Sequence, residues 1–152
     1  MSTPLQPNCG CISVAPDHAT TGEHLLRLGS NPSVVTGIVF FQTEQRCRLV
    51  EFYRDRLGLT EWLDQPCGCT ILQFETLLVG FCEASTTETE GIITLVVDDR
   101  DAVDDRYAAL RDVADDPPRR NDDFDIYQFF LEDPDGRTVE IQTFCHDHPA
   151  DR

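Results

Sequence analysis

Lysine is absent from this chain of 152 residues, so arginine supplies all 12 basic side chains, against 28 acidic ones. The resulting net charge of −16 argues against a nucleic-acid interface, which needs clustered basic residues to displace counterions. An acidic surface stays soluble where salt shortens the Debye length to about 3 Å, because screening removes the self-repulsion of the folded chain. We therefore expect a protein adapted to a salt-rich cytosol that does not bind nucleic acid.

Long apolar runs are also absent. No stretch approaches the roughly 20 apolar residues that cross a bilayer. Residues 1–16 lack the basic and apolar regions of a signal peptide. The seven cysteines, an odd number, favour a reducing compartment over a disulfide framework. These features predict a cytoplasmic protein with no membrane partner.

The chain is long enough for one domain with a hydrophobic core. Residues 1–33 are rich in Pro, Gly, Ser and Thr, and we expect a partly flexible extension there. Residues 34–145 carry the apolar patterns of a folded domain, and residues 146–152 form a short tail. The domain therefore begins near Val34.

The patterns of the domain predict a strand, a helix and three strands, in an order that occurs twice. Laying Gly91 on Gly37 brings Tyr107 onto Tyr53, so the two copies keep one register. Each half-sheet would leave an apolar face bare unless its partner completed the fold. The first copy comprises strand 34–42, helix 44–57 and strands 59–63, 70–75 and 77–82; the second comprises strand 91–97, helix 100–111, a weak strand within 113–124, and strands 126–132 and 138–144.

The last two strands meet at the segment 133–136, Asp-Pro-Asp-Gly, which predicts a tight turn. Proline presets φ, and glycine tolerates a positive φ. In the strand that follows, Thr138, Glu140 and Gln142 alternate with apolar residues, so they share one face of a sheet. The sequence therefore places a carboxylate in the middle of a sheet surface.

These motifs resemble the vicinal oxygen chelate (VOC) superfamily, which includes glyoxalase I, bleomycin-resistance proteins, fosfomycin-resistance enzymes and extradiol dioxygenases. The resemblance rests on the segments 50–59, 97–99 and 133–141, and it covers residues 34–144. It implies an α+β fold in which two βαβββ modules form an open, curved, eight-stranded half-barrel around a cleft. It also implies a divalent metal in that cleft and a possible homodimer.

The metal ligands that the resemblance implies are mostly missing. Family enzymes carry ligands on the first, fifth and eighth strands, and these positions fall here on Ile38, Ile92 and Glu140. Isoleucine has no donor atom, and a single carboxylate holds a divalent ion poorly against water. We therefore expect either no cofactor or an unknown divalent metal bound through Glu140. The cleft is expected to be lined by Ile38, Phe40, Gln42, Ile92, Thr94, Glu140 and Gln142.

Glu140 is also the candidate catalytic residue. It could act as a general base or as the counter-charge of a cationic ligand, because a buried carboxylate needs a compensating group. A structural hydrogen-bond network with Arg137 or Thr94 is the alternative.

Two Cys-Gly-Cys segments form a second candidate site. Cys9, Cys11, Cys67 and Cys69 together have the donors of a tetrahedral zinc site. Free thiols or an occasional disulfide are the alternative.

Three functions stay open at this point. The first is the binding of a small, mostly hydrophobic or cationic organic molecule in the cleft, without the usual metal triad. The second is a metal-dependent lyase or dioxygenase of the glyoxalase type that uses Glu140. The third is a cysteine-based zinc or redox-responsive protein. Whether the chain is an enzyme is left undecided.

Overall fold

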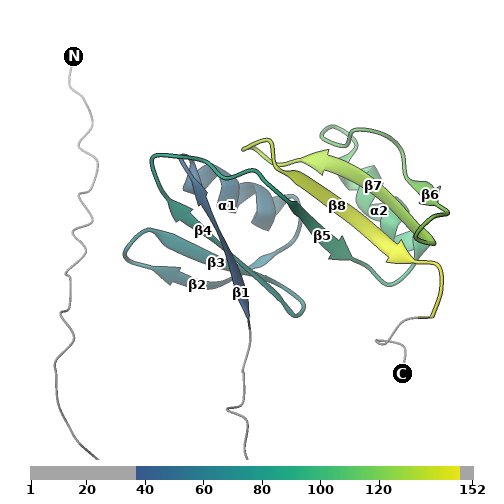
Figure 1. Cartoon of the computed structure of the whole chain (residues 1–152), viewed down its shortest axis with the longest axis horizontal. Helices are drawn as coiled ribbons and strands as arrows, with labels where there is room; N and C mark the ends of the chain where they lie inside the picture. Colours follow the sequence, from purple (N-terminus) through teal and green to yellow (C-terminus); the bar gives the residue numbers. More distant parts are fainter. Residues whose placement is uncertain (1–36, 148–152) are drawn as a thin grey trace, which may run out of the picture.

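A computed structural model of the chain describes residues 37–147, which form two modules with the same order of elements (Figure 1). The first module contains β1 (Ile38–Thr43), α1 (Arg46–Asp55), β2 (Thr60–Gln65), β3 (Cys69–Phe74) and β4 (Leu77–Glu83). The second contains β5 (Ile92–Val96), α2 (Arg100–Leu110), β6 (Arg119–Asn121), β7 (Ile126–Glu132) and β8 (Thr138–Phe144). The predicted pair of βαβββ modules is confirmed.

The two sheets have equivalent topologies. Their strand orders are β1-β4-β3-β2 and β5-β8-β7-β6, and in each sheet the first strand pairs in parallel with the last. The helix of each module packs on one face of its own sheet, which leaves the other face open (Figure 1). Within residues 37–147, neither helix is long and apolar enough to cross a membrane.

The alternation of side chains decides which face of each sheet is buried. In β8, Val139 and Ile141 have no exposed surface and join the core beneath α2, whereas Glu140 and Gln142 point to the open face. The helices begin and end where the sequence predicts within two residues. Asp99 caps α2, since its carboxylate accepts a hydrogen bond of 2.8 Å from the backbone N–H of Ala102.

β6, the strand that the sequence predicts only weakly, is the shortest one in the described part of the chain. β6 has three residues, and it follows Pro117 and Pro118 directly. Proline has no N–H to donate to a ladder, so the pairing with β7 begins only at Arg119. This explains why the segment 113–124 carries little strand pattern.

A buried arginine joins the two modules. Arg137 follows the β7–β8 turn and has no exposed surface. Its Nη1 donates a hydrogen bond of 2.6 Å to Oδ2 of Asp133, and its Nη2 donates to the backbone carbonyl of Glu88 in the linker between the modules. The guanidinium also lies over the ring of Phe41 in β1, at 4.5 Å from the ring centroid. The first module therefore surrounds a charge that the second module supplies.

The first module also contacts the turn that carries this arginine. The hydroxyl of Tyr53 in α1 donates a hydrogen bond of 2.8 Å to Oδ2 of Asp133. Nε2 of Gln45, just before α1, donates to the Pro134 carbonyl at 2.9 Å and to Oδ1 of Asp135 at 2.7 Å. Because these contacts are buried or half-buried, they fix the orientation of the turn relative to α1.

Replacement of Arg137 by methionine tests this junction. The change leaves the Asp133 carboxylate buried without its cation, and we expect the free energy of unfolding to fall by about 3–5 kcal/mol. Chemical denaturation measures it. The matched control is Arg54→Met, which breaks the exposed ion pair of Arg54 with Asp55 and should change stability by less than about 0.5 kcal/mol. Equal losses in the two variants would contradict the role of Arg137.

Alkaline titration tests the Tyr53 contact. Burial, and then the charge of Asp133, raise the pKa of Tyr53 well above its ordinary value of 10.0. The folded state therefore holds this proton more tightly than the unfolded state does, so its contribution is complete below pH 10 and is lost as the pH rises above it. Relative to Tyr53→Phe, the wild type should lose about 1.4 kcal/mol per pH unit above pH 10.

The composition simplifies this measurement. With no lysine in the chain, the side chains that titrate between pH 9 and 12 are the cysteines and the three tyrosines. Denaturation of the two proteins in parallel from pH 9 to 11.5 isolates Tyr53, since the other groups are shared. Parallel stability curves would contradict the predicted contribution.

Candidate ligand-binding site

The open face of the second sheet forms a cavity of about 550 Å³, a size typical of small-molecule sites. Its apolar lining consists of Ile92, Phe124, Ile126, Phe130 and Phe144. Its polar lining consists of Asn121, Gln128, Glu140, Gln142 and His146. The cavity therefore combines aromatic walls with a small number of polar groups.

The register of β8 and its neighbours assembles this lining. Glu140 lies opposite Phe130 in β7 on one side and opposite Thr94 in β5 on the other. Gln142 lies opposite Gln128 in β7. Since directly opposite residues point to the same face, β7 and β8 present one carboxylate and two amides side by side, with Thr94 of β5 next to the carboxylate.

Glu140 is the only carboxylate among the lining residues. The glutamate is 9% exposed, and its Oε2 accepts a hydrogen bond of 2.7 Å from the hydroxyl of Thr94. Across residues 37–147, its Oε1 atom has no hydrogen-bond partner. A carboxylate that is nearly buried and only half satisfied is a group that a ligand donor can complete.

The two glutamines beside Glu140 are also nearly buried and also have hydrogen-bonding groups without a partner in the described residues. Gln128 is 5% exposed and Gln142 is 7% exposed. No hydrogen bond to either side-chain amide occurs within the described part of the chain, yet neither amide is sealed from the cavity. The floor of the cavity therefore offers three nearly buried polar side chains with hydrogen-bonding groups available to a ligand.

The residues expected to line one cleft are divided between the two modules. Ile92, Glu140 and Gln142 line the cavity, and Thr94 donates a hydrogen bond to Glu140 from the neighbouring strand β5. Phe40 instead lines a separate cavity of about 480 Å³ beside the linker, and it contributes nothing to the Glu140 cavity. Ile38 lines neither of them.

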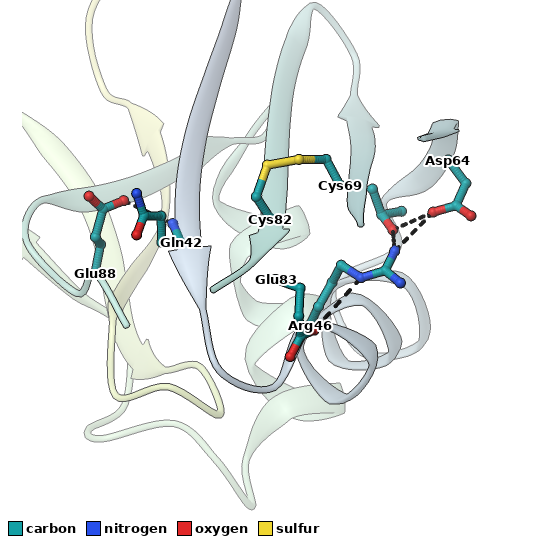
Figure 2. The surroundings of a disulfide bond; sticks show 8 residues. Gln42, Arg46, Asp64, Cys69, Cys82, Glu83 and Glu88 are labelled. Carbon is teal, nitrogen blue, oxygen red and sulfur yellow. Dashed lines mark hydrogen bonds and ion pairs between the residues drawn. A yellow bond between two sulfur atoms is a disulfide. The ribbon is translucent and has the colours of Figure 1, made fainter. Parts of the chain in front are cut away.

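Gln42 is taken up by the linker between the modules. Its backbone N–H donates to the carboxylate of Glu88 at 2.8 Å, and its side-chain oxygen accepts from the hydroxyl of Thr86 at 3.2 Å (Figure 2 shows Gln42 and Glu88). The structure therefore places Gln42 at the linker, away from the cavity that Glu140 lines. The linker runs along β1, so Phe40 and Gln42 of this strand lie at the linker and not on the open face of the second sheet.

Several lining residues were not predicted from the sequence. Phe130 is one of them: the structure buries its neighbour Phe129 in the core and leaves Phe130 at the cavity. The signal was present, because the predicted turn at 133–136 fixes the pairing of β7 with β8. That pairing sets Phe130 opposite Glu140 and Gln128 opposite Gln142.

The residues do not fit the metal that the resemblance implies. Isoleucines stand in β1 and β5 where the first two ligands would be, and Glu140 hydrogen-bonds a threonine. Residues 37–147 contain no group of three or more His, Cys, Asp or Glu side chains arranged to hold a metal ion. We therefore derive no chemical step through a metal at this site.

The cysteine zinc site also requires correction. Cys69 forms a disulfide with Cys82, so it offers no thiolate to a metal. Cys67 is a free, exposed cysteine. Cys9 and Cys11 lie outside the described residues.

No protein-family model matches the sequence, and no curated protein matches it. Solved structures do resemble it. Lactoylglutathione lyase from Agrobacterium tumefaciens is 18% identical, with a TM-score of 0.60 over 74% of this chain and 95% of that one. A glyoxalase/bleomycin resistance protein/dioxygenase from Nocardioides is 17% identical, with a TM-score of 0.61 over 80% of this chain and 89% of that one.

A glyoxalase/bleomycin resistance protein/dioxygenase family enzyme from Burkholderia phytofirmans PsJN is 19% identical, with a TM-score of 0.60 over 70% of this chain and 95% of its own. At these identities the likeness shows the fold. The fold expected from the VOC resemblance is therefore confirmed, whereas the reaction or ligand must be argued from the site.

Elemental analysis tests the metal argument. We expect protein purified from a metal-supplemented culture to carry no divalent metal that depends on Glu140, because β1 and β5 supply isoleucine at the ligand positions. The measurement compares wild type with Glu140→Ala. About one metal ion per chain in the wild type, absent from the variant, would show that Glu140 has ligands outside the described residues.

Proposed function

We propose that this chain binds a small organic cation with an apolar body in the cavity on the second sheet. The observation that carries the proposal is the half-satisfied carboxylate of Glu140 at the centre of an aromatic cavity. An ammonium group would complete the hydrogen bonding of Oε1 and balance the charge of the carboxylate. The rings of Phe130 and Phe144 would contact the rest of the molecule and favour a cation at their faces.

The two glutamines support selectivity. Gln128 and Gln142 each offer an amide oxygen and an amide N–H to the cavity. A ligand with a polar substituent beside its cationic group would pair with them. A wholly apolar ligand would leave these groups unpaired and bind more weakly.

The comparisons are consistent with binding or catalysis. The names of the similar proteins include a lactoylglutathione lyase and bleomycin resistance proteins, so the fold alone does not choose between a reaction and sequestration. The donor set favours binding here, because a glyoxalase-type lyase or an extradiol dioxygenase needs metal ligands that β1 and β5 do not supply. Glu140 then acts as the counter-charge of the ligand.

Calorimetric titration with matched compounds tests this function. The probes are an aromatic primary ammonium, which keeps N–H donors for Oε1, its neutral isostere with a methyl group in place of the ammonium, and an anionic analogue with a carboxylate. We expect the cation to bind most tightly. We further expect Glu140→Gln to weaken cation binding by about tenfold, which corresponds to about 1.4 kcal/mol, because the neutral amide keeps an oxygen for Thr94 and loses only the charge.

The matched control is Glu132→Gln, which removes one negative charge from an exposed position of β7 outside the cavity. It should leave the affinity for the cation unchanged within about twofold, because exposed charges are screened by salt. The proposal fails if both variants weaken binding equally, or if the neutral isostere binds as tightly as the cation does.

A further inference from the structure

A disulfide crosses the open face of the first sheet. Cys69 at the start of β3 and Cys82 near the end of β4 lie directly opposite each other, with their Cα atoms 4.0 Å apart. The backbone N–H of Glu83 donates to the carbonyl of Gly68 at 2.8 Å, so the hydrogen-bonded ladder continues past the disulfide. The pairing of β3 with β4 therefore does not depend on the sulfur–sulfur bond alone.

The disulfide lies on the side of the sheet away from α1. Thr70, next to Cys69, points to the opposite face, where its hydroxyl accepts a hydrogen bond of 2.7 Å from Nη1 of Arg46 in α1. Figure 2 shows the disulfide and Arg46. Because side chains alternate along a strand, Cys69 points to the open face. Both disulfide cysteines are half-buried, so their sulfur atoms can be approached from that face.

A free thiol stands two residues from this disulfide. Cys67 is exposed, and it occupies the middle of the three-residue loop Pro66–Gly68 that joins β2 to β3. Gly68 has a φ of +96°, a conformation in which glycine is free of the Cβ clash, so the loop turns tightly. The chain thus keeps an unpaired thiol next to one sulfur of an accessible disulfide.

We propose that Cys67, Cys69 and Cys82 form a thiol–disulfide exchange site. The thiol of Cys67 loses its proton to water, and the thiolate attacks Sγ of Cys69. A Cys67–Cys69 bond forms as the Cys69–Cys82 bond breaks, and the electron pair leaves on the sulfur of Cys82, which takes a proton from water. The number of disulfides is unchanged, so the step needs no oxidant or reductant.

The exchange moves the free thiol from a loop to the face of the sheet. Before the step, the unpaired cysteine is Cys67 in the β2–β3 loop. After it, the unpaired cysteine is Cys82, which lies opposite Gln42 in β1. The first module would then carry a thiol–disulfide exchange site that is separate from the cavity of the second module, since no cysteine among residues 37–147 lines that cavity.

Disulfide mapping in the full-length chain tests the proposal. Cys9 and Cys11 are first replaced by serine in every sample, so that no thiol of the N-terminal segment can take part. The oxidised protein is equilibrated without reductant at pH 8.5, and its thiols are captured with excess N-ethylmaleimide. Peptide mass spectrometry then reports which cysteine carries the label and which pair is linked.

We expect labelled Cys82 and a linked Cys67–Cys69 peptide in this parent protein. The label on Cys82 should fall by about tenfold or more in Cys67→Ser, because the loop holds the attacking thiol at a high effective concentration. The matched control is Cys47→Ser, which removes the exposed free cysteine of α1 and should leave the label on Cys82 unchanged. Equal labelling of Cys82 in the parent and in Cys67→Ser would overturn the proposal.

A second variant guards against a fold that Cys67→Ser alters. Cys82→Ser removes the leaving thiol, and oxidation with diamide should then link Cys67 to Cys69 within one chain. Far-ultraviolet circular dichroism verifies that the sheet persists, as the continuing ladder predicts. A folded Cys82→Ser protein that keeps Cys67 and Cys69 as two free thiols after oxidation would also overturn the proposal.

Discussion

The guanidinium of Arg137 is buried between the two modules, where a charge is stable only if its surroundings replace the water it has lost. Asp133 supplies the counter-charge, the Glu88 carbonyl supplies an acceptor, and the rings of Phe41 and Phe81 lie against the cation. The anion, cation and aromatic rings come from both modules. Separating the modules would therefore expose the apolar surfaces and also strip the Arg137–Asp133 ion pair of the Glu88 carbonyl and of the two aromatic rings.

This junction also positions the candidate site. Arg137 directly precedes β8, so the contacts that fix its side chain also fix the beginning of that strand. Glu140 follows three residues later and points to the open face, because Val139 and Ile141 on either side of it belong to the core. The buried network around Arg137 and the carboxylate of the candidate site are thus only three residues apart in the chain.

The repeated order of elements was predictable because the apolar periodicity of each helix and strand is visible within its own stretch of sequence. The place of Glu140 on a sheet surface followed from the turn before it, and its contact with Thr94 was one of two alternatives that the sequence offered. The role of Arg137 was not predictable in this way. An arginine after a turn is usually solvated, and only the packing of one module on the other buries it.

The residues expected in one cleft are divided between the modules, and this too depends on how one module packs on the other. Local patterns place Phe40 and Thr94 at equivalent positions of two sheets, but they do not say how the sheets lie relative to each other. The disulfide was one of the alternatives for the cysteines, but the predicted strand began at residue 70, one residue after Cys69, and only the observed register of β3 and β4 sets Cys69 opposite Cys82. The salt-adapted surface, the cytoplasmic location and the homodimer stay predictions.

Equivalent positions of the two modules carry different side chains with different structural roles. In the first module Phe40 lies opposite Gly80, and its ring fills the space above that glycine so closely that an added Cβ would come within 2.3 Å of it. In the second module the same two positions are Thr94 and Glu140. The Phe40 ring covers the face of the first sheet at this position, whereas Thr94 beside Glu140 leaves the face of the second sheet open.

The next pair along the sheet diverges in the same way. Cys69 and Cys82 occupy the positions that correspond to Gln128 and Gln142. In one module this cross-strand pair is covalent, and in the other it is a pair of amides that face a cavity. Because side chains on the open face carry little of the core packing, the repeated backbone tolerates both sets. One fold thus carries a candidate binding cavity on its second sheet and an accessible disulfide at the matching place on its first.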